Sequence, residues 1–173
     1  EYYYRNLSAP YTVTTVGGIG LRDAKWEENV FRAYCFWTPH EWVSLTAEYL
    51  LEDFDRDEDS ADGAQKVTTQ YVPLGVNLFH PSGFSAELKG THIYQNGDFE
   101  RQGATGTFRA GDDGFYLVDA ALGYRLPKRY GQLTAGVRNL FDTEGFEYLD
   151  TDERNPRIQP DRTVFIQLTL AFP

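Results

Sequence analysis

Residues 163–172, which read TVFIQLTLAF, decide the fold class of this chain. Val164, Ile166, Leu168, Leu170 and Phe172 fall on one face, and Gln167, Thr169 and Ala171 fall on the other. Because successive side chains of a β-strand point to opposite faces, one face of this segment is wholly apolar. The two-residue period therefore predicts a strand that buries one face, and it does not fit a helix.

The same alternation recurs through most of the chain. It is clear in residues 31–37, 43–51, 71–78, 84–94, 116–124 and 133–137. A weaker segment, rich in β-branched residues, covers about Tyr11 to Leu21. Together with the last segment, these patterns predict an all-β protein with about eight strands of about ten residues each.

Composition narrows the class of protein further. The 173 residues suit a single domain, and a net charge of −10 disfavours binding to nucleic acid. Mean hydropathy is −0.51, and no apolar run is long enough for a transmembrane helix. The chain has 12 Tyr, 12 Phe and 3 Trp, which is typical of β architecture with aromatic girdles. Since it contains no Met, we expect a processed product or a fragment.

The predicted connections alternate between short and long. Tight turns with Pro or Gly fall at residues 38–41, 80–83 and 127–131, and long polar connections fall at 53–65, 97–114 and 143–161. Short turns at one end and long loops at the other predict an antiparallel transmembrane β-barrel over residues 1–173. A soluble β-sandwich or lipocalin-like barrel stays open as an alternative, because alternation alone shows only that one face is buried.

Two stretches resemble a known family. VDAALGYR at 118–125 runs on to VRNLFD at 137–142, and NPR at 155–157 runs on to RTV at 162–164 and to Phe172. Together they resemble the closing strands of TonB-dependent receptor barrels. In addition, FHPSGF at 79–84, YRLPKR at 124–129 and DTD at 150–152 are similar to a relative in which such a barrel follows tetratricopeptide repeats.

The resemblance implies a C-terminal part of a larger transport barrel in the outer membrane of a Gram-negative bacterium. It implies outer-membrane lipid and the barrel-assembly machinery as partners, with an N-terminal barrel part, plug or repeat domain completing the protein. The tight turns would be periplasmic, and the substrates would be iron chelates, cobalamin or glycans. The tetratricopeptide relationship would favour export instead. No plug domain and no cofactor is expected within residues 1–173.

Two groups of side chains are candidates for roles in such a barrel. Charged residues opposite the apolar face would line a polar lumen, either as cross-strand ion pairs or as a conduit: Arg32, Glu48, Glu87, Lys89, Asp119, Arg125 and Arg138. Aromatic residues near strand ends would form belts at the membrane interface, with stacking platforms for sugars as the alternative: Trp37, Trp42, Tyr49, Tyr116, Tyr124 and Phe172.

Other chemistry has weaker support. Asp53, Asp55, Asp57 and Asp59 could form a weak cation loop, but Glu58 stands where a calcium hand needs Gly. No pair among the three histidines has helical metal-ligand spacing, and no Ser-His-Asp arrangement can be recognised, so we expect neither a metal centre nor an enzyme.

A second function remains open, a self-contained eight-stranded barrel with an anchoring or adhesive role. It requires Tyr11 to Leu21 to pair with Thr163 to Phe172.

Overall fold

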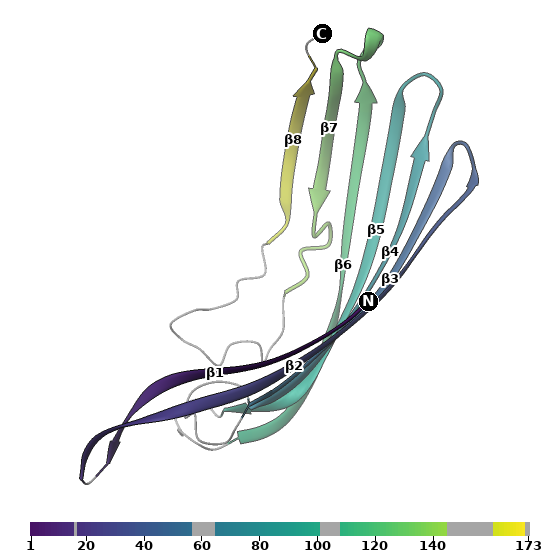
Figure 1. Cartoon of the computed structure of the whole chain (residues 1–173). Helices are drawn as coiled ribbons and strands as arrows, with labels where there is room; N and C mark the ends of the chain where they lie inside the picture. The colour runs from purple at the N-terminus through teal and green to yellow at the C-terminus, as the bar shows by residue number, and fades with distance from the viewer. Residues whose placement is uncertain (16, 57–64, 101–107, 145–160, 172–173) are drawn as a thin grey trace.

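The chain forms one antiparallel sheet of eight strands in sequential order (Figure 1). The computed structural model describes residues 1–15, 17–56, 65–100, 108–144 and 161–171. The strands are β1 (Tyr2–Thr15), β2 (Gly18–His40), β3 (Val43–Arg56), β4 (Lys66–Phe79), β5 (Phe84–Glu100), β6 (Phe108–Arg125), β7 (Gly131–Arg138) and β8 (Thr163–Leu170). A short 3₁₀ turn, η1 (Pro127–Arg129), joins β6 to β7. Among these residues, no helix is long and apolar enough to span a membrane.

The predicted all-β antiparallel class is confirmed, but the sheet is not closed. Within the described ranges, β1 pairs only with β2, and β8 pairs only with β7. The first and last strands are therefore the two edges of the sheet. A self-contained barrel requires Tyr11–Leu21 to pair with the last strand, and the described residues do not form this pairing.

The weak segment at Tyr11 to Leu21 is not one strand. β1 ends at Thr15, and β2 begins at Gly18, which has a φ of 124°. A positive φ of this size is accessible to glycine and strained for other residues, which suits Gly18 to the point where the chain reverses. In the sequence, the β-branched residues before the turn and the alternating residues after it form one continuous pattern, which predicts a single strand.

Most strands are longer than the predicted ten residues. β2 has 23 residues, β5 has 17 and β6 has 18, whereas β7 and β8 have 8 each. As a result, much of the expected loop at 97–114 belongs to β5 and β6. The extra length consists of polar segments held by backbone pairing, which hydrophobic alternation cannot detect.

The three predicted tight turns lie at one end of the sheet (Figure 1). The first is shifted, because β2 continues through Pro39 to His40 after a register irregularity that follows Trp37. The second turn contains Gly83 at a φ of 98°, and its N–H donates to the His80 carbonyl oxygen at 2.9 Å.

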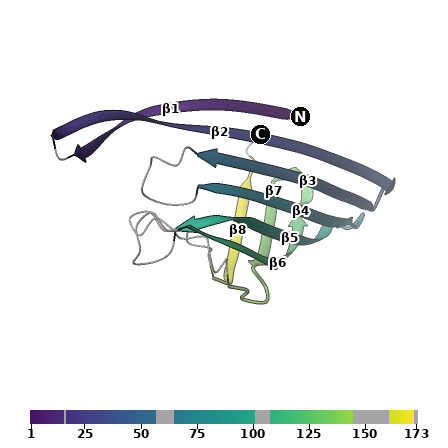
Figure 2. The same ribbon diagram turned by 90° about the horizontal axis from the view of Figure 1, so that it is seen from below.

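The two faces of the sheet differ in curvature. Extensive contacts join only neighbouring strands, so the sheet is a single layer (Figures 1 and 2). Side chains in a single layer can be shielded only by neighbours on the same face, and curvature crowds them on the inner side. The buried strand residues Thr69, Ile93, Gln95 and Phe115 share one face by register. We call this the concave face and the opposite one the convex face.

Two prolines lie within the strands and affect backbone hydrogen bonding. The pairing of β3 with β4 lapses between Ala47↔Leu74 and Leu50↔Tyr71, where Pro73 offers no N–H. Directly before β1, Glu1 exchanges both backbone hydrogen bonds with Arg32 of β2, at 2.8 and 2.9 Å. Odd-numbered residues of β1 therefore bond toward β2, and even-numbered residues, including Pro10, face the open edge.

Candidate functional site

The convex face carries a continuous apolar band across seven strands. Its members are the convex-facing residues of 31–37, 43–51, 72–78, 84–90, 116–124, 133–137 and 164–170, and none is charged. Many of them are strongly exposed in this chain, with Leu122 at 68% and Ile166 at 76%. An exposed apolar surface of this extent marks contact with a membrane or a partner.

The band ends sharply on the side away from the tight turns. The next convex residues are Asn29 in β2, Asp53 in β3 and Gln70 in β4, and in β6 Gly114 is followed by Asp112. In β3 the apolar stretch runs over nine residues from Val43 to Leu51, which is about 26 Å along the strand at about 3.3 Å per residue. That length corresponds to the roughly nine to eleven residues with which a tilted strand crosses a bilayer.

All seven residues proposed to line a lumen lie on the concave face. Pairing places Glu48 on the same face as Tyr34 and Arg32, and Lys89 directly opposite Asp119. The sheet register places the others with them: Glu87, Arg125 and Arg138. The shared face agrees with the sequence pattern, whereas the lumen itself stays a prediction.

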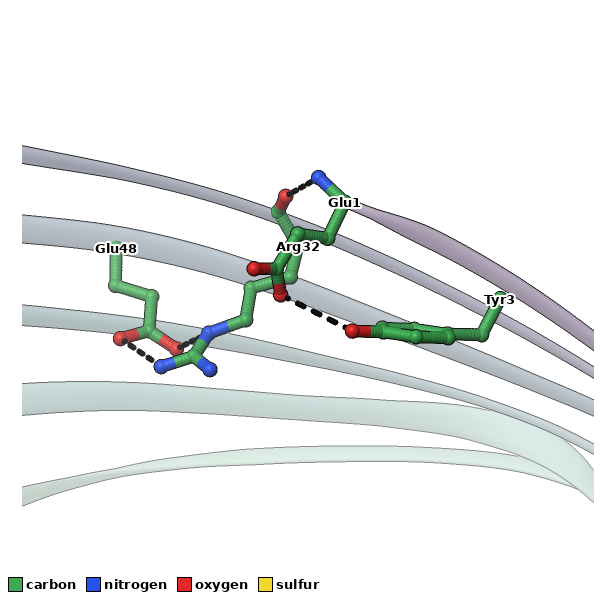
Figure 3. Close-up of polar contacts among 4 residues, drawn as sticks. All are labelled: Glu1, Tyr3, Arg32 and Glu48. Atoms are coloured by element: carbon green, nitrogen blue, oxygen red, sulfur yellow. Dashed lines mark hydrogen bonds and ion pairs between the residues drawn. The ribbon is translucent and has the colours of Figure 1, made fainter.

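Two cross-strand ion pairs tie β1, β2 and β3 together on the concave face. Arg32 donates to both carboxylate oxygens of Glu48, from Nε at 2.7 Å and from a terminal nitrogen at 3.1 Å (Figure 3). Beside them the Tyr3 hydroxyl donates to Glu1 at 3.4 Å, and Arg5 pairs with Glu28. Bidentate pairing satisfies these charges within the sheet, which favours a structural role for Arg32 and Glu48.

Sequence reasoning missed the residue that organises the end of β7. Asn139 is buried and has a φ of 50°. Its backbone N–H donates to the Asp119 carboxylate at 2.9 Å, and its side-chain amide makes two hydrogen bonds to the backbone of Thr143. Nearby, Asp142 accepts the N–H of Arg162 at 2.8 Å. The Asn-Leu-Phe-Asp motif thus joins the two ends of the β7–β8 connection. An Asn directly after a strand, where a positive φ is common, was the available signal.

The proposed interfacial aromatics fall into three groups. Trp37, Tyr49, Tyr116 and Tyr124 lie on the convex face, and Trp42 lies in the β2–β3 turn. Phe172 lies outside the described residues. All three convex tyrosines lie against neighbouring rings, with centroid distances of 4.7 Å for Tyr124 and Phe84, 4.5 Å for Tyr116 and His92, and 6.3 Å for Tyr49 and Phe31.

The proposed cation loop is only partly described. Asp53 accepts a hydrogen bond from the Thr68 hydroxyl at 2.8 Å, and Asp55 lies 3.7 Å from the Lys66 ammonium. Both carboxylates therefore contact β4, while Asp57 and Asp59 lie outside the described residues. In the part of the chain that the structure covers, no three His, Cys, Asp or Glu side chains gather as metal ligands.

No family model, curated protein or solved structure matches this chain. The likeness to TonB-dependent receptors consequently rests on the motif residues alone.

Proposed function

We propose that this sheet forms part of the wall of an outer-membrane transport barrel in a Gram-negative bacterium, similar to the C-terminal barrel of a TonB-dependent receptor. The observation that carries the proposal is the uncharged apolar band on the convex face, opposite a concave face that carries the charges. Lipid would cover the band, and the charged face would border the path of a polar substrate. The function is passage, not catalysis.

The distribution of the two faces argues against a soluble barrel or sandwich. A soluble β-barrel hides its apolar face on the inside of the curve and shows polar residues to water. Here the curvature is the reverse, with Leu122 and Ile166 outside and Lys89 and Asp119 inside. This inversion is what a membrane barrel requires.

The open edges favour a larger barrel over a self-contained anchoring or adhesive one. Unpaired backbone groups cost several kcal/mol each in lipid, so β1 and β8 would each need a neighbouring strand. Further barrel strands would supply those neighbours, and a plug or repeat domain would complete the protein. Outer-membrane lipid and the barrel-assembly machinery are the other proposed partners.

The single cysteine allows a direct test. Cys35 is exposed on the convex face, and Tyr34, its neighbour in β2, points to the concave face with 53% of its surface exposed. We would refold the chain into phospholipid vesicles and measure labelling by a charged thiol reagent. The matched variant is Tyr34→Cys with Cys35→Ser, which moves the thiol to the opposite face.

We expect the native thiol to react at least about tenfold more slowly than the thiol of the variant, because lipid excludes the charged reagent from the band. Both proteins should react equally in denaturant, which controls for intrinsic reactivity. Equal rates in vesicles that carry the folded sheet, as shown by co-flotation with lipid and a β-type circular dichroism spectrum, would exclude lipid contact at the convex face.

A further inference from the structure

Two histidines and a tryptophan form a cluster at the tight-turn end of the sheet. The His40 and Trp42 rings meet edge to face at 5.4 Å, and Trp42 and His80 lie 6.0 Å apart between centroids. The turns that carry them are joined, because the Phe79 N–H donates to the Trp42 carbonyl oxygen at 2.8 Å. The three rings belong to two different hairpins, so the fold brings them together, and sequence spacing does not reveal them.

Hydrogen bonds within the turns fix the tautomer of both imidazoles. Nδ1 of His40 accepts the N–H of Trp42 at 3.3 Å, and Nδ1 of His80 accepts the N–H of Ser82 at 3.3 Å. His80 Nδ1 also lies 2.6 Å from the Ser82 hydroxyl. A nitrogen that accepts these bonds carries no proton, so each neutral ring carries its proton on Nε2. Nε2–H is then a donor, and neither Nε2 has a partner among the described residues.

The cluster lies at the border of the apolar band. His40 pairs with Val43, a band residue, on the convex face, and Trp42 keeps 45% of its surface exposed. Tryptophan is enriched where a membrane meets water, because its ring is apolar and its N–H is polar. If lipid covers the band, two imidazole donors beside an exposed indole would stand at the depth of the lipid headgroups.

We propose that His40, Trp42 and His80 form a contact site for the phosphate of a lipid headgroup at the tight-turn end of the sheet. This rests on the proposed function, since it requires the band to lie in lipid. The two Nε2–H groups would donate to phosphate oxygens while Trp42 lies among the acyl ester groups. Charged residues at the same end of the sheet include Glu41 in the same turn and Arg125, whose N–H donates to the Gly83 carbonyl oxygen at 2.8 Å.

The test compares two micelles that share an alkyl chain, dodecylphosphocholine and dodecyl maltoside, of which only the first contains phosphate. The NMR titration midpoints of His40 and His80 are measured in the full chain in each. A nearby phosphate stabilises the imidazolium, so we expect both midpoints to be about 0.5 to 1 pH unit higher in dodecylphosphocholine, a three- to tenfold gain in proton affinity. His40→Asn and His80→Asn assign the signals, because an Asn side chain can accept the same turn N–H.

Equal midpoints in the two micelles would overturn the headgroup contact. The same rise caused by inorganic phosphate in dodecyl maltoside would show that free phosphate suffices, which overturns the lipid as its source. The Cys35 labelling experiment measures lipid contact at the convex face independently of the histidines. Protected Cys35 with equal midpoints would refute this contact alone, whereas reactive Cys35 would refute the barrel wall.

Discussion

A charge placed in the centre of the apolar band should be costly only if lipid covers it. Leu88 lies on the convex face of β5, about 13 Å along the strand from Phe84 and the same distance from His92, which pairs with the band residue Tyr116. It is 54% exposed in this chain. An arginine near the bilayer midplane costs about 2–4 kcal/mol on the lipid face of a barrel. We expect Leu88→Arg to lower the free energy of unfolding in lipid by that amount, or about 30- to 900-fold in the folding equilibrium.

The assay is reversible urea unfolding in phospholipid vesicles, followed by tryptophan fluorescence. Asn77→Arg is the matched control, because it adds the same charge on the concave face, directly opposite Glu87. We expect this control to change stability by no more than about 0.5 kcal/mol, as for ordinary exposed positions. If Leu88→Arg is as mild as Asn77→Arg in vesicles, the convex face does not contact lipid and the reasoning fails.

Three further predictions concern local structure. Gly136→Ala should destabilise the chain by about 1–3 kcal/mol in urea unfolding, since a Cβ there would lie 2.8 Å from the Ala120 carbonyl oxygen, whereas Gly90→Ala meets no atom within 4 Å and should be neutral. Asn139→Ala should cost about 2 kcal/mol and Asn139→Gly less, because glycine keeps the positive φ; equal losses would contradict the strain argument. A double-mutant cycle on Arg32 and Glu48 should give a coupling of only about 0.5–1 kcal/mol, as both side chains are partly exposed, and a much larger value would indicate a pair shielded from water.

The alternation of apolar and polar residues predicted those features of the fold that require one apolar face. The last strand, Thr163–Leu170, and the shared face of Glu48, Lys89 and Asp119 follow from a two-residue period. Strand length did not follow, because residues 22–29 of β2 are mostly polar and are held by backbone bonds that any side chain permits. Closure did not follow either, since it depends on which strands meet at the edges.

The clusters that the sequence could not reveal depend on turn geometry. His40 and His80 are 40 positions apart, and only the joining of two hairpins brings both rings to Trp42. Asn139 acts through a backbone φ of 50°, which no hydrophobic pattern records. In contrast, Asp53 and Asp55 looked like ligands in sequence but contact Thr68 and Lys66, because β3 continues further than its apolar stretch.

Pro10 limits how far another strand can attach to β1. Its ring replaces the N–H that would face an incoming strand, so recruitment along the open edge can proceed beside Tyr2 to Ser8 but loses a bond at Pro10. The β1–β2 hairpin beyond that point is thereby discouraged from joining stray chains into cross-β stacks. One imino acid thus separates an edge segment that can be completed by a partner from a hairpin tip that resists aggregation.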